Sequence, residues 1–212
     1  MNQILFTNEN EIQKIKKNKS KKFKLLLYSS LLLIFFLLSF YLYKDILSDK
    51  KENMSYTILN SYNIERLYSG NNNPQTSIVL NNGQKFLVIG NIEIPKVNMN
   101  YPILSNTNDE LLKISPCRFY GPYPNETGNL CIAAHNYDDN RFFGNLYKLD
   151  IGDEIRIYDS KNEMIKYYIY DKYETEKNNI SCTSQDTNGK KEVTLVTCNN
   201  LNGNRLIIKA KE

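Results

Sequence analysis

Histidine and tryptophan are the residues that this chain uses least. Its 212 residues include one histidine, His135, and no tryptophan, and none of its four cysteines forms a CxxC pair. Protein zinc sites combine several cysteine and histidine ligands at short spacings, so a zinc site from Cys131 and His135 has no support. No motif indicates another cofactor. Any imidazole chemistry in this protein must therefore use His135.

Internal repeats and low-complexity tracts are also absent, and the composition is that of an ordinary globular protein. A length of 212 residues suits one domain with a core and some appendages. The net charge of +4 is local, because seven lysines lie between Lys14 and Lys24. These lysines have no interleaved aromatic residue before Phe23, so they do not indicate a nucleic-acid partner.

Charge is missing altogether from Leu25 to Tyr43, a run dominated by Leu, Ile and Phe. A helix of that length measures about 28 Å, enough to cross a hydrocarbon core of roughly 30 Å. The run is too long for a signal peptide and ends without a small-x-small cleavage site, so we expect an uncleaved membrane anchor. A buried core helix is the alternative, although such a helix is rarely apolar on every face.

The lysines before the anchor predict its orientation. Seven lysines precede the apolar run, whereas Lys44 and the residues that follow it carry mixed charges. By the positive-inside rule, residues 1–24 form a cytoplasmic tail and everything after the anchor at 25–43 lies outside the cell. The segment 44–85 is expected to be a stalk and linker, with a short amphipathic helix within Glu52–Tyr68 and a break at Gly70–Pro74.

From residue 86 to 212 the pattern is that of a mostly β domain. Seven short segments are rich in β-branched and aromatic residues and are bounded by turn residues. They are Leu87–Ile94, Tyr101–Leu104, Gly128–His135, Asp153–Tyr158, Met164–Lys172, Glu192–Cys198 and Arg205–Lys211. Brief helices are expected at Asn108–Ile114 and Arg141–Leu149. Seven or eight strands with few helices indicate a sandwich or a closed barrel.

Three residues at strand ends have the chemistry of a cysteine acyl-transfer site. The strand Glu192–Cys198 ends at a thiol, Arg205 opens the next strand, and His135 ends the apolar run that begins at Leu130. A thiol with a pKa near 8.5 needs an imidazole, a cation or a helix N-terminus to become a nucleophile. A guanidinium can meet the negative charge of a tetrahedral intermediate. Arg141, in contrast, is expected to be a loop residue.

Strand parity is compatible with such a site. Thr194, Val196 and Cys198 share one face of their strand, and Cys131 and His135 share one face of theirs. The alternative is structural, because free cysteine is among the most buried residue types and a lone histidine is often a satisfied structural residue. If the domain lies outside the cell, disulfide bonding is another explanation for the presence of the cysteines.

The combination of motifs resembles the sortase family. The motifs are Thr194-Leu195-Val196-Thr197-Cys198 with Arg205 in the next strand, His135-Asn136 after an apolar strand, Ile94-Pro95-Lys96-Val97, Phe143-Gly144-Asn145-Leu146 and Leu149-Asp150-Ile151-Gly152-Asp153. The resemblance covers roughly residues 90–211. It implies a closed eight-stranded β-barrel with a few short helices, preceded by a transmembrane helix. It further implies that Cys198 is the nucleophile, His135 the acid/base and Arg205 the oxyanion or substrate clamp.

The resemblance also implies a reaction and its partners. Sortases of Gram-positive bacteria cleave a C-terminal sorting signal such as Leu-Pro-x-Thr-Gly and pass the acyl group to an amine of a peptidoglycan precursor or a pilin. Two departures concern the subclass: Ala134 replaces the small glycine that is common before the histidine, and 177–190 is too short for the long helix of class B. No acidic cluster matches a family calcium site.

The remaining cysteines and the overall function each leave an alternative open. Cys117, Cys131 and Cys182 are expected to be buried or in loops, and Cys117 with Cys131 is the pair to test for a disulfide. The alternative function is a non-catalytic, membrane-anchored β-domain that binds a surface partner through its tyrosines. A papain-like hydrolase fits less well, because there the cysteine precedes the histidine in the sequence.

Overall fold

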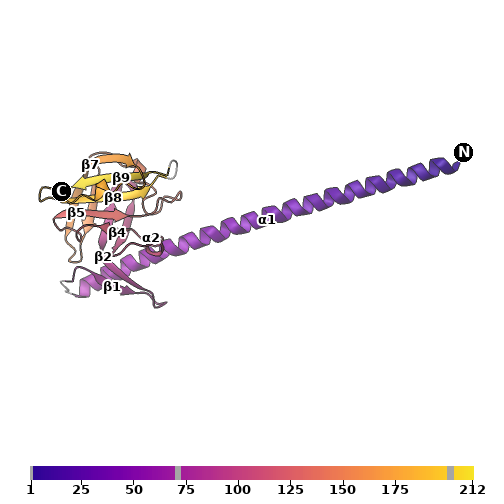
Figure 1. The fold of residues 1–212 in the computed structure, drawn as a ribbon. Coiled ribbons are helices and arrows are strands. Elements are labelled where there is room, and N and C mark those ends of the chain that lie inside the picture. The colour runs from indigo at the N-terminus through magenta and orange to yellow at the C-terminus, as the bar shows by residue number, and fades with distance from the viewer. Residues whose placement is uncertain (1, 70–72, 200–202) are drawn as a thin grey trace. The chain divides into compact units, whose positions relative to one another are not determined.

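The computed structural model describes residues 2–69, 73–199 and 203–212 (Figure 1). It divides into two compact units, one up to Asp49 and one from Lys50 to Glu212. Residues 70–72 of the predicted break at Gly70–Pro74 and residues 200–202 of the turn after Cys198 lie outside the described residues.

The first unit is the N-terminal part of helix α1 (Asn2–Ser69). Within Lys21–Leu67 this helix contains an 18-residue window with a mean hydropathy of 2.3, long and apolar enough to cross a membrane. The hydroxyl groups of Ser29 and Ser30 donate to the carbonyl oxygens of Leu26 and Leu27, both at 2.8 Å. The polar atoms of these two serines are therefore satisfied inside the helix, as an apolar surrounding requires.

The second unit is built on one closed sheet. Its strands are β1 (Thr76–Val79), β2 (Lys85–Ile94), β3 (Met99–Leu104), β4 (Cys117–Tyr120), β5 (Gly128–Ala133), β6 (Glu154–Tyr158), β7 (Met164–Thr175), β8 (Lys191–Cys198) and β9 (Arg205–Lys211). Their order is β1-β2-β3-β4-β5-β8-β9-β7-β6, and β6 also pairs with β2. Strands β2 to β9 therefore close into an eight-stranded barrel, to which β1 is added. The predicted fold class is confirmed.

Strand β2 closes the barrel because it changes partner along its length. Its first half pairs with β1, up to Val88, and its second half pairs with β6, from Asn91. Gly90 lies at the change of partner, where a Cβ atom would come within 2.3 Å of the Tyr158 carbonyl oxygen. Only glycine allows the two backbones to approach this closely.

The barrel interior holds the main core. Alternate residues of the strands point inward, as the period of two dictates. Among the fully buried side chains are Ile92, Ile103, Ile132, Ile157, Leu195 and Ile208, and Phe142, Phe143, Leu146 and Leu149 from the β5–β6 connection join them.

The second unit starts earlier than the expected boundary at residue 86. Ile58 and Tyr62, near the end of α1, are completely buried against Phe86, Val88 and Leu104. A buried hydrogen bond of 3.2 Å also joins the hydroxyl groups of Ser55 and Ser115. The expected stalk and linker at 44–85 was wrong in this part, because Ile58 and Tyr62, with Met54 beside them, form a face of α1 that packs on the barrel.

The remaining predicted elements agree to within a few residues. All seven predicted strands are present, although β5 ends at Ala133 rather than at His135. The predicted helices shrink to α2 (Asp109–Leu112), capped by the Asn108 side chain, and the 3-10 helix η2 (Leu146–Lys148). Two further 3-10 helices are η1 (Pro95–Val97) and η3 (Ser181–Thr183). Strands β1 and β4 were missed because each has only four residues.

Two separate sequence motifs meet in the fold. The Lys96 ammonium group, in the motif after β2, lies 2.8 Å from an Asp150 carboxylate oxygen and 2.7 Å from one of Asp153. The same Asp153 oxygen accepts a hydrogen bond of 2.6 Å from the Asp150 backbone N–H. The lysine thus ties the turn that leads into β6 to the end of β2.

Candidate active site

Strands β5, β8 and β9 bring the three predicted site residues to one end of the barrel, which we call its edge. Strand β8 lies between the other two, parallel to β5 and antiparallel to β9 (Figure 1). The C-terminal ends of β5 and β8 and the start of β9 therefore share an edge. Cys198, the last residue of β8, is the register partner of Arg205, the first residue of β9.

His135 lies two residues beyond β5 and is fastened to the end of β8 on both sides. On one side, the Thr197 hydroxyl donates to the Ala134 carbonyl oxygen at 2.8 Å, in a buried position. On the other, the Asn136 side-chain amide donates to the Cys198 carbonyl oxygen at 2.8 Å. The backbone on either side of the histidine is thus held against the two residues that end β8. From the sequence, Asn136 is recognisable only as the neighbour of His135, and no role is predicted for it.

Cys198 is the exposed thiol among four free cysteines. The other three are buried, as expected, and no disulfide joins Cys117 to Cys131. Burial raises the pKa of the Cys117 and Cys131 thiols to about 12, and it also raises the pKa of Cys182. These three thiols stay protonated at neutral pH, and Cys198 is the one cysteine whose thiol is exposed to solvent.

The surroundings of His135 favour the neutral imidazole. Burial lowers the pKa of His135 below its usual value, and the positive charges of Lys113 and Lys51 lower it further, while the Asp109 carboxylate opposes them. The ring of Tyr137 lies 5.3 Å from the imidazole, centroid to centroid. A neutral imidazole at pH 7 is free to accept a proton.

Arg205 is restrained by the connection between β7 and β8. Its Nε donates a hydrogen bond of 2.8 Å to the Lys177 carbonyl oxygen. This connection, residues 176–190, contains η3 as its one helical element, which agrees with the sequence argument against class B. The bond uses Nε and limits the orientations that the planar guanidinium can take.

The same connection covers the outer face of the site strands. Cys182 packs with Val196 of β8 and Ile207 of β9 in a small buried cluster. The Thr194 hydroxyl donates to the Asn129 side-chain oxygen at 2.8 Å, across β8 and β5. These contacts place Thr194 and Val196 on the same, outer face of β8, whereas His135 lies beyond the end of β5. Cys198 lies where this outer face ends and is exposed there.

Arg141 occupies a position that its sequence context did not indicate. It is in a loop, as expected, but only 7% of its surface is exposed. Its guanidinium carbon lies 4.2 Å from the centre of the Tyr137 ring, and its Nε lies 2.9 Å from an Asp139 carboxylate oxygen. Arg141 thus supports the aromatic neighbour of His135. Nothing in the sequence signals this, because the three residues lie in one polar stretch.

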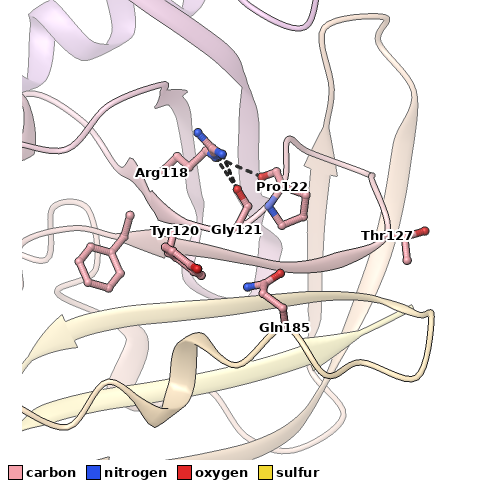
Figure 2. A pocket seen from close by; sticks show the side chains of 7 residues that line it. Arg118, Tyr120, Gly121, Pro122, Thr127 and Gln185 are labelled. Carbon is pink, nitrogen blue, oxygen red and sulfur yellow. Dashed lines mark hydrogen bonds between the residues drawn. The ribbon is translucent and has the colours of Figure 1, made fainter.

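A hollow in the surface lies away from these residues. It is lined by Arg118, Tyr120, Pro122, Thr127 and Gln185, among others, near the start of β5, whereas His135 follows the end of that strand (Figure 2). The Arg118 guanidinium donates to the carbonyl oxygens of two of its own loop neighbours, as the dashed lines in Figure 2 show. This hollow holds none of the three site residues. In the described part of the chain, no group of three or more Cys, His, Asp or Glu side chains is arranged to hold a metal ion.

Comparison with known proteins places this geometry in a family. A family model described as a sortase domain matches residues 92–212. Sortase A of Bacillus anthracis is 30% identical over 118 residues, which is 52% of this chain and 52% of that protein. Sortase A of Listeria monocytogenes is 26% identical over 118 residues, 55% of this chain and 52% of that one. The chain thus spans about half the length of the curated relatives it matches.

Solved structures agree with the sequence matches. The sortase D5 transpeptidase of Clostridium perfringens superposes with a TM-score of 0.56 at 26% identity, covering 75% of this chain and 95% of the other. Sortase A of Corynebacterium diphtheriae gives a TM-score of 0.53 at 25% identity, over 58% and 60% of the two chains. The barrel that carries His135, Cys198 and Arg205 is matched by sequence and by structure over more than half of the chain, and the chain therefore belongs to the sortase family of cysteine transpeptidases.

Proposed function

We propose that this chain is a membrane-anchored cysteine transpeptidase with Cys198 as the nucleophile and His135 as the acid/base. The observation that carries the proposal is the edge shared by β5, β8 and β9, where the exposed thiol pairs in register with Arg205 and the histidine is fastened to the end of β8. A cysteine nucleophile requires both a proton acceptor and a group that meets oxyanion charge, and this edge supplies both types.

The first half of the reaction forms a thioester. Neutral His135 takes the proton of the Cys198 thiol, and the sulfur attacks the scissile carbonyl carbon. The Arg205 guanidinium stabilises the negative charge on the oxygen of the tetrahedral intermediate. When the C–N bond breaks, the histidine returns its proton to the departing amine, and the acyl group stays on the sulfur.

The second half passes the acyl group to an amine. An acceptor amine attacks the thioester carbonyl, and His135 takes the proton that the nitrogen loses. The C–S bond then breaks, the sulfur leaves as the thiol, and a new amide is formed. The bonds broken and formed are equivalent, so the reaction needs no external energy source or cofactor.

For the donor we propose a secreted protein with a C-terminal Leu-Pro-x-Thr-Gly-like sorting signal. For the acceptor we propose an amine of a peptidoglycan precursor or of a pilin. Membership of the sortase family supports both assignments, and one structural neighbour is named as the sortase C1 of a streptococcal pilus island. Helix α1 supports membrane anchoring by its length and apolar composition, with residues 1–24 in the cytoplasm and the barrel outside a Gram-positive cell.

The test is to trap the thioester. The full chain in detergent is incubated with Leu-Pro-x-Thr-Gly-like peptides that differ at each position, and intact-mass spectrometry detects an acyl adduct. We expect an adduct on the wild type and on Cys182→Ala, no adduct on Cys198→Ala, and release by hydroxylamine or an amine peptide. If wild type and Cys198→Ala behave alike with every peptide, the alternative of a non-catalytic binding domain replaces the proposal.

A further inference from the structure

A continuous column of aromatic rings joins helix α1 to His135. The Tyr56 ring stacks on Tyr101 at 5.5 Å between centroids, and Tyr101 meets the edge of Phe142 at 5.0 Å. Phe142 lies 5.8 Å from Tyr137, which in turn lies 5.3 Å from the imidazole of His135. Each separation is within the range of direct ring contact. Three elements contribute: α1, β3 and the connection after β5.

At the end of the column on α1, the two stacked tyrosines also share a hydrogen-bond acceptor. One carboxylate oxygen of Glu52 accepts from the Tyr101 hydroxyl at 3.0 Å and from the Tyr56 hydroxyl at 3.3 Å. Tyr101 and Phe142 are buried, whereas Tyr56 is 42% exposed. The outermost ring is therefore held by contacts to the column and to its own helix.

The end of the column on the histidine side carries backbone strain. Phe142 has a φ angle of +51°, a left-handed conformation that bulky residues avoid. The backbone around it bridges to Asn136, and the Phe143 N–H donates to the His135 carbonyl oxygen at 3.1 Å. A strained residue persists only where its surroundings determine its conformation, and such residues concentrate at functional sites. Packing of the Phe142 ring between Tyr101 and Tyr137 is the surrounding that does so here.

We propose that this aromatic column positions His135 for proton transfer, so that residues 52–56 of the membrane-proximal helix are part of the catalytic apparatus rather than a spacer. The inference rests on the proposed function of His135. The segment that carries the imidazole is tied to β8 through the Ala134 carbonyl oxygen and the Asn136 side chain, and the column supplies a contact to the ring itself. Tyr56, Tyr101, Phe142 and Tyr137 are positioning residues, because they act on the substrate through the histidine.

Because charged groups surround the imidazole, a change in its position should change the pKa of His135, which can be measured. Burial disfavours the protonated form of His135, and its charge also feels Lys113 at the C-terminal cap of α2, Asp109 in α2 and Lys51 in α1. If the column loosens, the ring gains access to water and moves within this field. The pKa of the histidine then rises toward its ordinary value. Because the chain has one histidine, labelled imidazole gives one NMR signal whose assignment is certain.

The experiment compares Tyr56→Ala with Tyr56→Phe in the full chain in detergent micelles. Tyr56→Ala removes the outermost ring, and Tyr56→Phe keeps the ring but removes the hydroxyl. Tyr168→Ala is the matched control, since Tyr168 is 47% exposed on β7 and stacks on none of these rings. The pKa of His135 is measured by NMR titration, and kcat and KM are measured with the peptide that acylates the wild type fastest.

We expect Tyr56→Ala to raise the pKa of His135 and to lower kcat on the order of tenfold with KM within about twofold, because misplacing an acid/base group weakens the chemical step more than binding. Tyr56→Phe and Tyr168→Ala should match the wild type. The inference is overturned if Tyr56→Ala leaves the pKa unchanged, or if Tyr56→Phe fails to restore it. The NMR arm needs no turnover, so an inactive wild type would refute the proposed function and leave this test intact.

Discussion

Cys198 and Arg205 face each other as paired residues of two antiparallel strands, with the turn between those strands at the edge of the barrel. The pairing fixes the distance between their Cα atoms through the sheet rather than through a loop. In the proposed mechanism this pairing holds the nucleophile and the group that meets oxyanion charge on rigid strands, so their geometry is kept while substrates enter and leave.

The four cysteines should differ sharply in reactivity. A thiol reagent applied to the folded chain should modify Cys198 alone, because burial keeps the thiols of Cys117, Cys131 and Cys182 inaccessible and protonated. Peptide mapping by mass spectrometry checks this. Cys198→Ala should then show no modification until denaturant is added. Rapid modification of any other cysteine in the native chain would contradict the burial.

Turnover should depend on His135 with a predictable response to pH. The neutral imidazole accepts the proton, and its pKa lies below the usual value of about 6.5, so activity should fall only as the pH drops through that lowered value. Folding stability linked to this group has the same sign, being present above the ordinary pKa and lost as the pH falls through the folded one. His135→Ala should reduce turnover by about 10²–10⁴-fold.

Two charged residues near His135, Lys113 and Asp109, allow opposite changes of charge to be compared for their effect on the pH dependence of activity. Lys113→Gln removes a positive charge and should move the acidic limb of the pH–rate profile to higher pH. Asp109→Asn removes a negative charge and should move it to lower pH. The direction of each shift is read from kcat/KM measured across pH. Shifts of equal sign in both variants would mean that these charges do not act on the histidine.

Arg205 should not be replaceable by lysine. Arg205→Lys keeps the charge but loses the planar fork and the Nε donor that bonds to Lys177, so turnover should fall on the order of 10–10³-fold. Arg205→Ala removes the positive charge as well, so the difference between Arg205→Ala and Arg205→Lys measures what the charge alone contributes to turnover. Equal activities of Arg205→Lys and the wild type would show that a point charge is sufficient.

The C-terminal part of α1 should be required for the full stability of the barrel unit. A chain that begins at residue 73 lacks Ile58 and Tyr62 and exposes Phe86 and its apolar neighbours, so it should unfold at a markedly lower temperature than a chain that begins at Lys50. Within the full chain, Ile58→Ala should cost about 2–5 kcal/mol of unfolding free energy. Exposed Ile64→Ala on the same helix is the control. Chemical denaturation of each variant gives the comparison.

Orientation in the membrane can be tested on cells. Protease added to intact cells that express the chain should cut after Lys44 and leave residues 1–24 protected, because the seven lysines precede the apolar run. Antibodies against each end report the fragments. Cleavage of the N-terminal tail in intact cells would reverse the predicted topology.

The sequence was informative where local chemistry dictates structure. The seven long strands, the shortened helix capped by Asn108 and the strand ends at Cys198 and Arg205 follow from β-branched runs, turn residues and capping. The packing of Ile58 and Tyr62 on the barrel was not predictable in this way. Their loose helical period looks the same whether the buried face meets a barrel or forms a stalk.

The aromatic column around His135 was hidden for a related reason. Tyr56, Tyr101 and Phe142 come from three distant parts of the chain, and only the tertiary fold makes them neighbours. Asn136 is adjacent to His135 and carried a sequence signal, whereas the role of Arg141 depends on how its loop folds back on Tyr137. These contacts depend on the exact backbone path of the loop after β5. The spacing of apolar residues in the sequence does not determine that path.

Three buried free thiols have a consequence for how the protein responds to oxidants and reductants. Because no disulfide links its cysteines, the folded state owes none of its stability to oxidation, and its melting temperature should be the same with and without a strong reductant. Redox conditions should act on Cys198 alone, which the surroundings can oxidise while the barrel stays intact. Loss of activity under oxidation would thus be a chemical event at one sulfur atom, reversible as far as the sulfenic acid or a mixed disulfide, rather than a loss of structure.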